Sequence, residues 1–380
     1  MSQIEIVPAD GLFRFLAYCR LPRLLYAGMD GFAPPLDVER WAMHSPMLNP
    51  HFKLVESQRF LARRDGRWVG RIEAHVYKPE ITPVAASRHQ FGALDAIDDL
   101  EVVRALVAAA EGWLAARGAA TIHGPFSPSI NHECGLLIEG ATTPPMVMTP
   151  WHPPYLGALL ETLGYGKARD LLTFEFNVAD QDLTQPARIA NRKEWRDRLK
   201  MRPLKLDQLK TGETELMTDL FNDAWSGNWG YVERTRAEFD SDADVLGYVV
   251  PAEYGIVVEF DGAPVAFLIA LPNLCEIWSD LDGRLFPFGL FKLLSRLRKH
   301  SYESARVLLL GTRKSLQSSA TGGAILLGVV EEIRRRAGST SASRMEAGWV
   351  LEDNVAMRKP IEIFGGKVDK IHRIYEKRLP

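Results

Sequence analysis

The sequence predicts an α/β fold with a mixed sheet, built as two copies of one α/β unit. Two strand–turn–strand hairpins centre on Asp65-Gly66 and Asp261-Gly262, which stand 261 − 65 = 196 positions apart. The loop residues Phe32 and Trp229 stand 229 − 32 = 197 positions apart. Because these landmarks recur in register, the chain reads as an internal duplication.

Each copy runs through the same elements in the same order. A strand and a helix come first, then the hairpin, then a further strand with a long helix, and finally a strand that follows a glycine. The predicted elements are strands at 4–7 and 201–206, helices at 12–25 and 215–225, hairpins at 59–76 and 255–271, helices at 100–114 and 323–336 with a strand at 306–311 before the second, and last strands at 172–176 and 371–377. The charged stretch 191–200 joins the copies, so we expect domains at 1–190 and 191–380.

Composition excludes several classes of function. The chain has 380 residues, 46% of them apolar, a formal charge of −2 and three cysteines far apart in sequence. Such a charge gives no general attraction to nucleic acid, and an odd number of cysteines without metal-ligand spacing favours neither disulfides nor a zinc site. With no apolar leader and no run of membrane-spanning length, we expect a cytoplasmic protein that at most touches a membrane surface.

The loop at 311–323 has a composition suited to a phosphate. It follows a strand and opens a helix, and glycines at a helix start expose N–H groups at the positive end of the helix dipole. Hydroxyls of Ser318, Ser319 and Thr321 add donors, and Arg313 and Lys314 add charge. An ordinary polar loop with a glycine turn is the alternative.

The same place in the first copy is acidic. Asp98 and Asp99 precede the helix at 100–114. Both are good helix-start residues, but their carboxylates would occupy the dipole end and repel a pyrophosphate. We therefore expect the first domain to lack the cofactor.

The strand, loop and helix at 306–336, with Trp349 to Asn354 and Ile361 to Gly366 after them, resemble the GNAT acyltransferase superfamily. In that family a loop of the form R-x-x-G-x-G/A holds the pyrophosphate of coenzyme A. Here Gln317 stands in place of the arginine and Ala320 in place of the first glycine. The resemblance implies acyl-CoA as co-substrate, without a metal, held by the following residues: Leu310, Gly311, Thr312, Gln317, Ser318, Ser319, Ala320, Thr321, Gly322 and Gly323.

Over both halves the chain resembles a group of bacterial tandem GNAT proteins. The shared stretches are 124–131, 133–135 and 283–289. Bacterial ceramide synthases, which transfer a fatty acyl group from acyl-CoA to the amine of a sphingoid base, are similar to this arrangement. The resemblance implies an acyl-CoA-dependent N-acyltransferase with a long-chain donor and a lipid-like amine acceptor.

Acyl transfer to an amine needs a group that takes a proton. In the GNAT fold the thioester lies between the fourth and fifth strands, so Glu352 at the end of the fifth strand is the predicted base and Asn354 the orienting residue. Alternatively, Glu352 and Asp353 cap the next helix. The family's tyrosine, which often protonates the leaving thiolate, is replaced by Ile361, and Tyr375 and Tyr231 are the candidate substitutes.

Candidate acceptor contacts come from both copies. Asn131, His132 and Glu133 follow the fifth strand of the first copy, where they bind substrate or hydrogen-bond the backbone. Trp229 lies in a loop of the second copy. Phe286 and Phe288 belong to the stretch 283–300, which alternates apolar and basic residues. That stretch suits a membrane-surface helix, a cover over an acyl channel, or a helix packed on the second domain with its charges in water.

Two other functions stay open. One is acetyl transfer to a small polar amine. The other is a non-catalytic ligand-binding or scaffolding role, which the altered loop and the missing tyrosine would fit.

Overall fold

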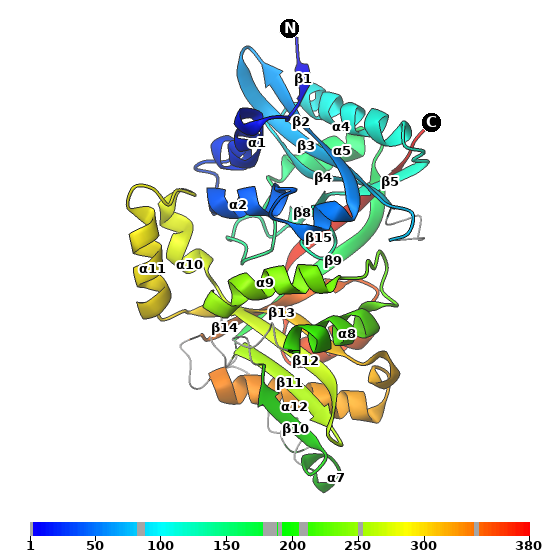
Figure 1. Ribbon diagram of the computed structural model, residues 1–380, viewed down its shortest axis with the longest axis vertical. Coiled ribbons are helices and arrows are strands. Elements are labelled where there is room, and N and C mark those ends of the chain that lie inside the picture. The colour runs from blue at the N-terminus through cyan, green and yellow to red at the C-terminus, as the bar shows by residue number, and fades with distance from the viewer. Residues whose placement is uncertain are drawn as a thin grey trace. The chain divides into compact units, whose positions relative to one another are not determined.

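The computed structural model describes residues 3–81, 88–177, 188, 192–204, 212–249, 254–337 and 342–380 (Figure 1). The chain forms two compact units. Unit 1 comprises Met1–Leu171, Ile277–Leu294 and Lys370–Pro380, and unit 2 comprises Leu172–Glu276 and Ser295–Asp369. The predicted boundary at 190/191 lies outside the described residues and stays a prediction.

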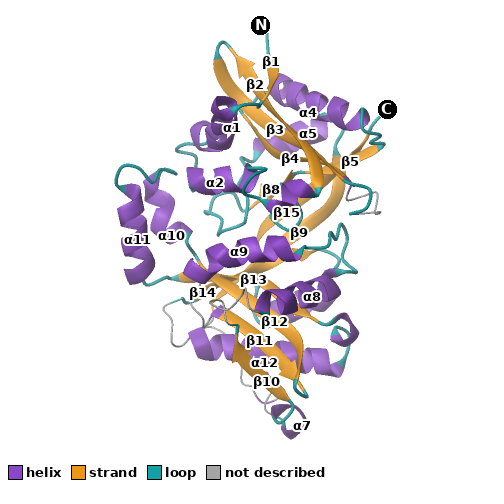
Figure 2. Cartoon of the chain, viewed as in Figure 1, coloured by secondary structure: helices purple, strands orange, loops and turns teal. Residues whose placement is uncertain are grey.

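Unit 1 is a mixed sheet with strand order β1-β2-β3-β4-β5-β15-β9, and β8 pairs with β15. Helices α4 and α5 cover one face of this sheet, while α1 and α2 lie on the other (Figure 2). Its elements are β1 Glu5–Pro8, α1 Leu12–Leu25, α2 Asp37–His44, η1 Pro50–Lys53, β2 Val55–Arg64, β3 Arg67–Tyr77, β4 His89–Ala96, α4 Leu100–Ala115, β5 Thr121–Gly124, β6 Phe126–Ser127, β7 Glu133–Cys134, β8 Leu136–Glu139, α5 Tyr155–Thr162 and the first part of β9 Gly166–Asn177.

Unit 2 repeats this plan with strand order β9-β14-β13-β12-β11-β10. Helix α12 packs on one face of the sheet, and the aromatic side chains of α8 pack on the other. Its elements are α7 Lys193–Arg196, β10 Leu199–Pro203, α8 Glu213–Trp225, α9 Arg236–Val249, β11 Gly255–Phe260, β12 Ala263–Pro272, β13 Ser304–Thr312, η6 Lys314–Leu316, α12 Ala320–Ala337, β14 Arg344–Leu351 and α13 Val355–Ile363. Elements α10 Cys275–Trp278, α11 Gly289–Lys299 and β15 Lys367–Arg378 include residues of both units, and η5 Ser279–Leu281 belongs to unit 1.

The two predicted hairpins are confirmed. The β2–β3 turn has positive φ at Asp65 and Gly66, and the β11–β12 turn has it at Asp261 and Gly262. Two consecutive residues with positive φ form the turn that matches the twist of antiparallel strands, which explains the Asp-Gly sequence at both places. The mixed α/β fold in two GNAT-like copies is therefore confirmed.

The last strand of each copy joins the other unit. β15, at the end of the chain, pairs with β5 of unit 1, where Tyr375 stands opposite Gly124. The second part of β9 lies beside β14 in unit 2, where Arg344 pairs with Glu175 at 3.0 Å. A division into consecutive halves therefore differs from the division into compact units at these strands.

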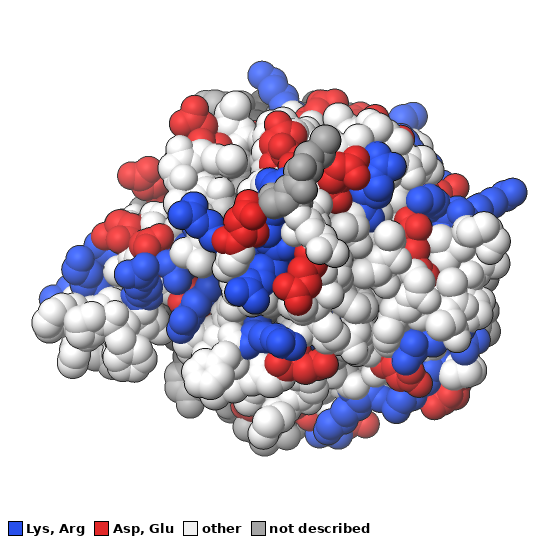
Figure 3. All heavy atoms as spheres, turned by 90° about the horizontal axis from the view of Figure 1, so that it is seen from above, with Lys and Arg blue, Asp and Glu red and all other residues white. Residues whose placement is uncertain are grey.

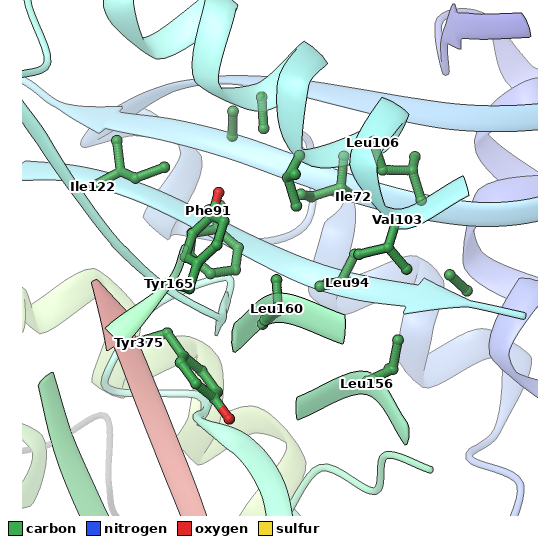
Figure 4. Close-up of a cluster of buried hydrophobic side chains, with 14 of the residues drawn as sticks. Ile72, Phe91, Leu94, Val103, Leu106, Ile122, Leu156, Leu160, Tyr165 and Tyr375 are labelled. Carbon is green, nitrogen blue, oxygen red and sulfur yellow. The ribbon is translucent and has the colours of Figure 1, made fainter. Parts of the chain in front are cut away.

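The core of unit 1 fills the space between the sheet and helices α4 and α5 (Figure 4). Ile72 points from β3 toward Val103 and Leu106 of α4, and the ring of Phe91 in β4 lies against that of Tyr165, with ring centroids 5.3 Å apart. Helix α4 begins at Asp99, whose side chain accepts hydrogen bonds from the N–H groups of Glu101 and Val102, as a helix N-cap does.

The surface of the chain mixes both signs of charge. Lys and Arg side chains alternate with Asp and Glu over the face seen in Figure 3. None of the described helices combines the length and the apolar character that a membrane crossing requires.

Candidate functional site

Strands β13 and β14 of unit 2 part after a short parallel ladder. Their described pairs run from Ser304 opposite Arg344 to Val307 opposite Ala347. β13 continues to Thr312, and there its described pairing is with β12 on its other side. The backbone groups on this edge of β13 beyond Val307 can therefore hydrogen-bond an extended ligand, because a strand edge pairs readily with an amide-bearing chain.

The predicted phosphate loop follows this open edge directly. Helix α12 begins at Ala320, three positions before the predicted start, because Ser319 supplies its first side-chain hydrogen bond. The Ser319 hydroxyl accepts from the N–H of Gly322 at 3.0 Å and donates to the carbonyl of Leu316 at 2.7 Å. A Cβ on Gly322 would lie 2.1 Å from that carbonyl, so the turn requires glycine. A Cβ on Gly323 would meet nothing within 4 Å, so the first turn of α12 borders open space.

Gln317 holds the loop in place. Its side-chain amide donates to the carbonyl of Ala224, in α8, at 2.8 Å and to that of Thr312, in β13, at 2.9 Å. Gly311, before the loop, lies against Trp225, since a Cβ there would come within 2.2 Å of the indole ring. Gln317 thus positions the loop through its neighbours.

The two cationic residues of the loop make different contacts. Arg313 forms an ion pair with Asp219, whose hydrogen bond raises the pKa of the Arg313 guanidinium. Lys314 donates its backbone N–H to Asp223 at 2.9 Å and its ammonium to Ser226 at 3.3 Å. The Arg313 charge is therefore paired with a carboxylate of α8, whereas the Lys314 ammonium contacts a neutral hydroxyl. The N–H groups and hydroxyls of the loop, together with the Lys314 ammonium, are what it offers a phosphate.

Glu352 and Asn354 lie just beyond β14. Asn354 caps α13, since its side-chain oxygen accepts the N–H of Met357 at 3.2 Å. Glu352 is half-buried, and its backbone carbonyl accepts a hydrogen bond from Arg358 at 2.5 Å. In the alternative reading Glu352 and Asp353 cap this helix, but in the structure Asn354 does so.

The two candidate tyrosines lie in different units. In unit 2 the hydroxyl of Tyr231 donates to the side chain of Asn222 at 2.9 Å, and burial together with the charge of Glu233 raises the pKa of Tyr231 to about 12. Tyr375 belongs to the core of unit 1, where its hydroxyl donates to Glu161 at 3.1 Å. Burial and the charge of Glu161 raise the pKa of Tyr375 well above its usual value.

In unit 1 the chain itself fills the space beside the middle of the fourth strand, β4. A Cβ on Gly92, in β4, would lie 1.5 Å from the carbonyl oxygen of Phe126. The N–H of Ala93 donates to the hydroxyl of Ser127 at 2.9 Å. At the start of α4, Asp99 accepts the free N–H groups and pairs with Arg64 at 2.6 Å. The N–H groups of Ala93, Glu101 and Val102 thus have partners within the chain, and the lack of a cofactor in the first domain stays a prediction.

The predicted acceptor residues of unit 1 take part in internal contacts. Glu133 forms a two-bond ion pair with Arg40. His132 lies 2.7 Å from the hydroxyl of Ser129, and the N–H of Asn131 donates to the same hydroxyl at 3.1 Å. The three consecutive residues are thus all held by contacts within unit 1.

A buried polar face of β3 was not predicted. Arg71, Glu73 and His75 alternate with the apolar residues that face α4, yet all three are buried under α1 and α2. Arg71 pairs with Asp95 at 2.7 Å, and the carboxylate of Glu73 lies 3.1 Å from His44. Burial alone would raise the pKa of Glu73, but the hydrogen bond from His44 outweighs this effect and lowers the pKa to about 2. The alternation at 71–76 was the available signal, but it is equally typical of a solvent-facing strand.

The remaining predicted contacts are dispersed. Trp229 is half-buried in the loop after α8, in unit 2. Phe286 and Phe288 are exposed and belong to unit 1. Within the described ranges, no group of three or more His, Cys, Asp or Glu side chains could hold a metal ion.

Comparison with known proteins supports the architecture. Protein YghO of Escherichia coli (strain K12) is 38% identical over 363 residues, which cover 96% of this chain and 92% of that protein. The bacterial ceramide synthase of Caulobacter vibrioides is 38% identical over 381 residues, which cover 100% of this chain and 98% of that protein. No model of a known protein family matches the sequence.

Among solved structures, a tandem GNAT protein from the clavulanic acid biosynthesis pathway superposes with a TM-score of 0.58 at 13% identity, over 99% of this chain and 98% of that one. A GCN5-related N-acetyltransferase from Anabaena variabilis gives a TM-score of 0.53 at 8% identity, over 99% and 73% of the two chains. The chain has two repeated units, and in unit 2 the fourth strand, β13, has an open edge and leads into the glycine-bearing start of α12. These features define the class of tandem GNAT proteins. The chain belongs to the family of tandem GNAT N-acyltransferases that contains the bacterial ceramide synthase.

Proposed function

We propose that the protein transfers a long-chain acyl group from acyl-CoA to the primary amine of a lipid-like acceptor such as a sphingoid base. The observation that carries the proposal is the open edge of β13, which leads directly into the glycine-bearing start of α12 in unit 2. Full-length similarity to a bacterial ceramide synthase supports the choice of acceptor.

The residues of unit 2 fit an acyl-CoA. Leu310, Gly311 and Thr312 lie on the open part of β13, where backbone groups suit the amides of the pantetheine arm. The pyrophosphate would be held by the loop between Gln317 and Gly323, where Gly322 lets the backbone turn tightly and Gly323 borders open space. The remaining members of the proposed cradle are Ser318, Ser319, Ala320 and Thr321. Acyl-CoA supplies an activated thioester carbonyl.

Glu352 is the proposed base. An ammonium acceptor must lose a proton before its nitrogen can attack a carbonyl carbon, and a carboxylate at the end of β14 is suited to take it. Attack by the neutral amine forms the C–N bond. As the C–S bond breaks, the nitrogen loses its second proton and the departing thiolate takes one up, so that an amide and the free CoA thiol result. Asn354 would keep Glu352 oriented by fixing the start of α13. Tyr231 and Tyr375 remain the candidates for the proton donor to the thiolate.

Residues of unit 1 are proposed to contact the acceptor without binding a second acyl-CoA. Asn131, His132 and Glu133 are the candidates there, with Trp229 of unit 2 and with Phe286 and Phe288 for the acyl chains. A lipid-like amine partitions into membranes, so we propose that the protein works in the cytoplasm and contacts the inner face of the cytoplasmic membrane peripherally.

Calorimetry and a thiol-release assay test the proposal. Acyl-CoA affinity that rises from acetyl-CoA to palmitoyl-CoA, with thiol release stimulated by sphinganine, is the expected result. Thiol release with acetyl-CoA and small polar amines alone would favour the second enzymatic function. Absence of binding by acetyl-, palmitoyl- and free CoA would sink the enzyme proposal and favour a scaffold.

A matched pair of variants tests the base. Glu352→Gln removes the carboxylate and should lower kcat by about 100-fold, the usual contribution of a general base. Glu362→Gln removes an exposed carboxylate of α13 that pairs with Arg358, and it should keep kcat within about twofold, as a surface change does. Equal turnover of the two variants would mean that another group takes the proton.

A further inference from the structure

Three phenylalanines and a leucine of unit 1 project into solvent. Phe286 is 81% exposed, Phe288 72%, Phe291 73% and Leu294 50%. These four residues are called the phenylalanine surface below. Phe286 and Phe288 precede α11, and Phe291 and Leu294 lie within it. By contrast, Phe91, Phe126, Phe174 and Phe267 are fully buried. Exposure of neighbouring large apolar side chains is costly in water and marks a contact surface.

Helix α11 does not need these rings in order to pack. Its half-buried leucines are Leu290, Leu293 and Leu297, and Arg296 is half-buried as well. At 3.6 residues per turn these leucines share one side of the helix, while Phe288, Phe291 and Lys292 lie toward the other. The helix therefore has one apolar side for the protein and a second that is turned outward. This arrangement excludes a helix that turns only its charges toward water.

The same stretch carries positive charge alone. Between Gly283 and Tyr302 the sequence contains no Asp or Glu, although the whole chain has a formal charge of −2. The positive residues are Arg284, Lys292, Arg296, Arg298 and Lys299. Arg284, Lys292 and Lys299 are exposed. An apolar surface bordered by cations complements a surface that is apolar inside and anionic at its edge.

The segment is fixed at its base. Arg23 of α1 lies 3.4 Å from Asp282 and 3.1 Å from Asp37, and the N–H of Asp37 donates to the carbonyl of Gly283 at 2.9 Å. A Cβ on Gly283 would lie 2.8 Å from the Arg23 side chain. Trp278 and Leu281 are buried before this point. The phenylalanines are thus presented by an anchored segment.

We propose that the phenylalanine surface docks on an anionic lipid bilayer. The rings would enter the boundary between headgroups and acyl chains, and the neighbouring Lys and Arg side chains would meet lipid phosphates. A protein partner would need both a large apolar groove and an acidic rim, whereas an anionic bilayer offers both properties over any area. The docking deepens the proposed function, since it names the surface through which the enzyme would reach a membrane-borne amine.

Vesicle co-sedimentation of the full chain tests the docking without acyl donor or acceptor. The protein should sediment with vesicles of phosphatidylcholine mixed with phosphatidylglycerol, and less with phosphatidylcholine alone or at high salt. The triple variant Phe286→Ser, Phe288→Ser, Phe291→Ser should bind at least about tenfold more weakly, because it loses three inserted rings. The pair Lys292→Glu, Lys299→Glu should lose about fivefold for each charge.

Two matched controls accompany these variants. Phe13→Ser removes a phenylalanine of α1 that is 88% exposed, and Arg104→Glu reverses an exposed charge of α4. Both should bind vesicles as the unchanged protein does. Circular dichroism and the thermal midpoint check that each variant is folded.

Several results would overturn the docking. In the first, the unchanged protein stays in the supernatant with anionic vesicles. In the second, the triple variant binds vesicles as well as Phe13→Ser does. In the third, the unchanged protein forms a dimer without vesicles and the triple variant is monomeric. The last result would assign the surface to a second copy of the chain. Because binding is measured without substrates, a failure of acyl transfer would leave the docking intact, and a failure of docking would leave the transferase proposal to its own assay.

Discussion

Arg40 donates two hydrogen bonds to the carboxylate of Glu133, at 2.7 and 2.6 Å, inside unit 1. Each side chain is 8% exposed. Burial raises the pKa of Glu133, but the charge and the hydrogen bonds of Arg40 lower it below its usual range. The pair therefore joins α2 to β7 as two ionised groups, and this gives Glu133 a structural task whether or not it also contacts an acceptor.

Glu133→Ala should strongly destabilise the protein. The substitution leaves the Arg40 guanidinium buried without its main counter-charge, and breaking a buried pair in this way costs about 3–5 kcal/mol. Chemical denaturation of the full chain measures the loss. Glu139→Ala, an exposed carboxylate in β8, is the control and should change the free energy of unfolding by less than about 0.5 kcal/mol. If Glu133→Ala keeps its stability and instead raises KM for the acceptor, the residue serves as a substrate contact.

The filled space in unit 1 leads to a paired glycine prediction. Gly92→Ala would drive a methyl group into the carbonyl of Phe126, which lies 1.5 Å from the added carbon. Because both groups belong to packed backbone, the substitution should cost at least about 3 kcal/mol. Gly112→Ala, inside α4, meets nothing within 4 Å and should stabilise the protein by about 0.5–1 kcal/mol. Denaturation midpoints that shift in the same direction for both variants would contradict this view of β4.

Local features of the sequence predicted most of the fold. The Asp-Gly turns fix both hairpins, and the apolar spacing at 100–114 matches α4. The exchange of the last strands could not be predicted, because the pairing of β15 with β5 and of β9 with β14 depends on contacts between residues far apart in the sequence.

The candidate sites were predicted less completely. Composition singled out the loop before α12 as a candidate phosphate site, which stays a prediction, and the pairing of Arg313 with α8 depends on tertiary structure. The polar face of β3 reads as a solvent-facing strand, since alternation cannot distinguish water from the buried ion pairs that Arg71 and Glu73 make.

Acid should destabilise unit 1 through its buried histidines. Burial lowers the pKa of both His44 and His75 below the usual value of about 6.5. Below that pH the unfolded chain binds protons that the folded chain does not bind, so the free energy of unfolding falls as pH drops. The contribution is fully present above pH about 6.5, and its loss reaches at most about 1.4 kcal/mol per pH unit for each histidine.

Thermal midpoints recorded from about pH 7 to about pH 5 measure this dependence, because histidines titrate in that range. Glu73, with a pKa of about 2, does not titrate in this window, so the slope reports the histidines. His75→Gln should reduce the slope relative to the unchanged protein. A slope that persists in full in this variant and in His44→Gln would assign it to other groups.

Gln317→Ala should weaken acyl-CoA binding while leaving the chemistry largely intact. The glutamine donates to the carbonyls of Ala224 and Thr312, and loss of two such hydrogen bonds, each worth about 0.5–1.5 kcal/mol, loosens the loop that leads into α12. KM for acyl-CoA should rise about tenfold, with a smaller change in kcat. Ser315→Ala, an exposed neighbour in the same loop, is the matched control and should keep both constants. A fall in kcat at unchanged KM would mean that Gln317 acts in the transition state. A residue that only positions the cofactor loop contributes equally to binding of the ground state and of the transition state, so its loss raises KM and leaves kcat unchanged.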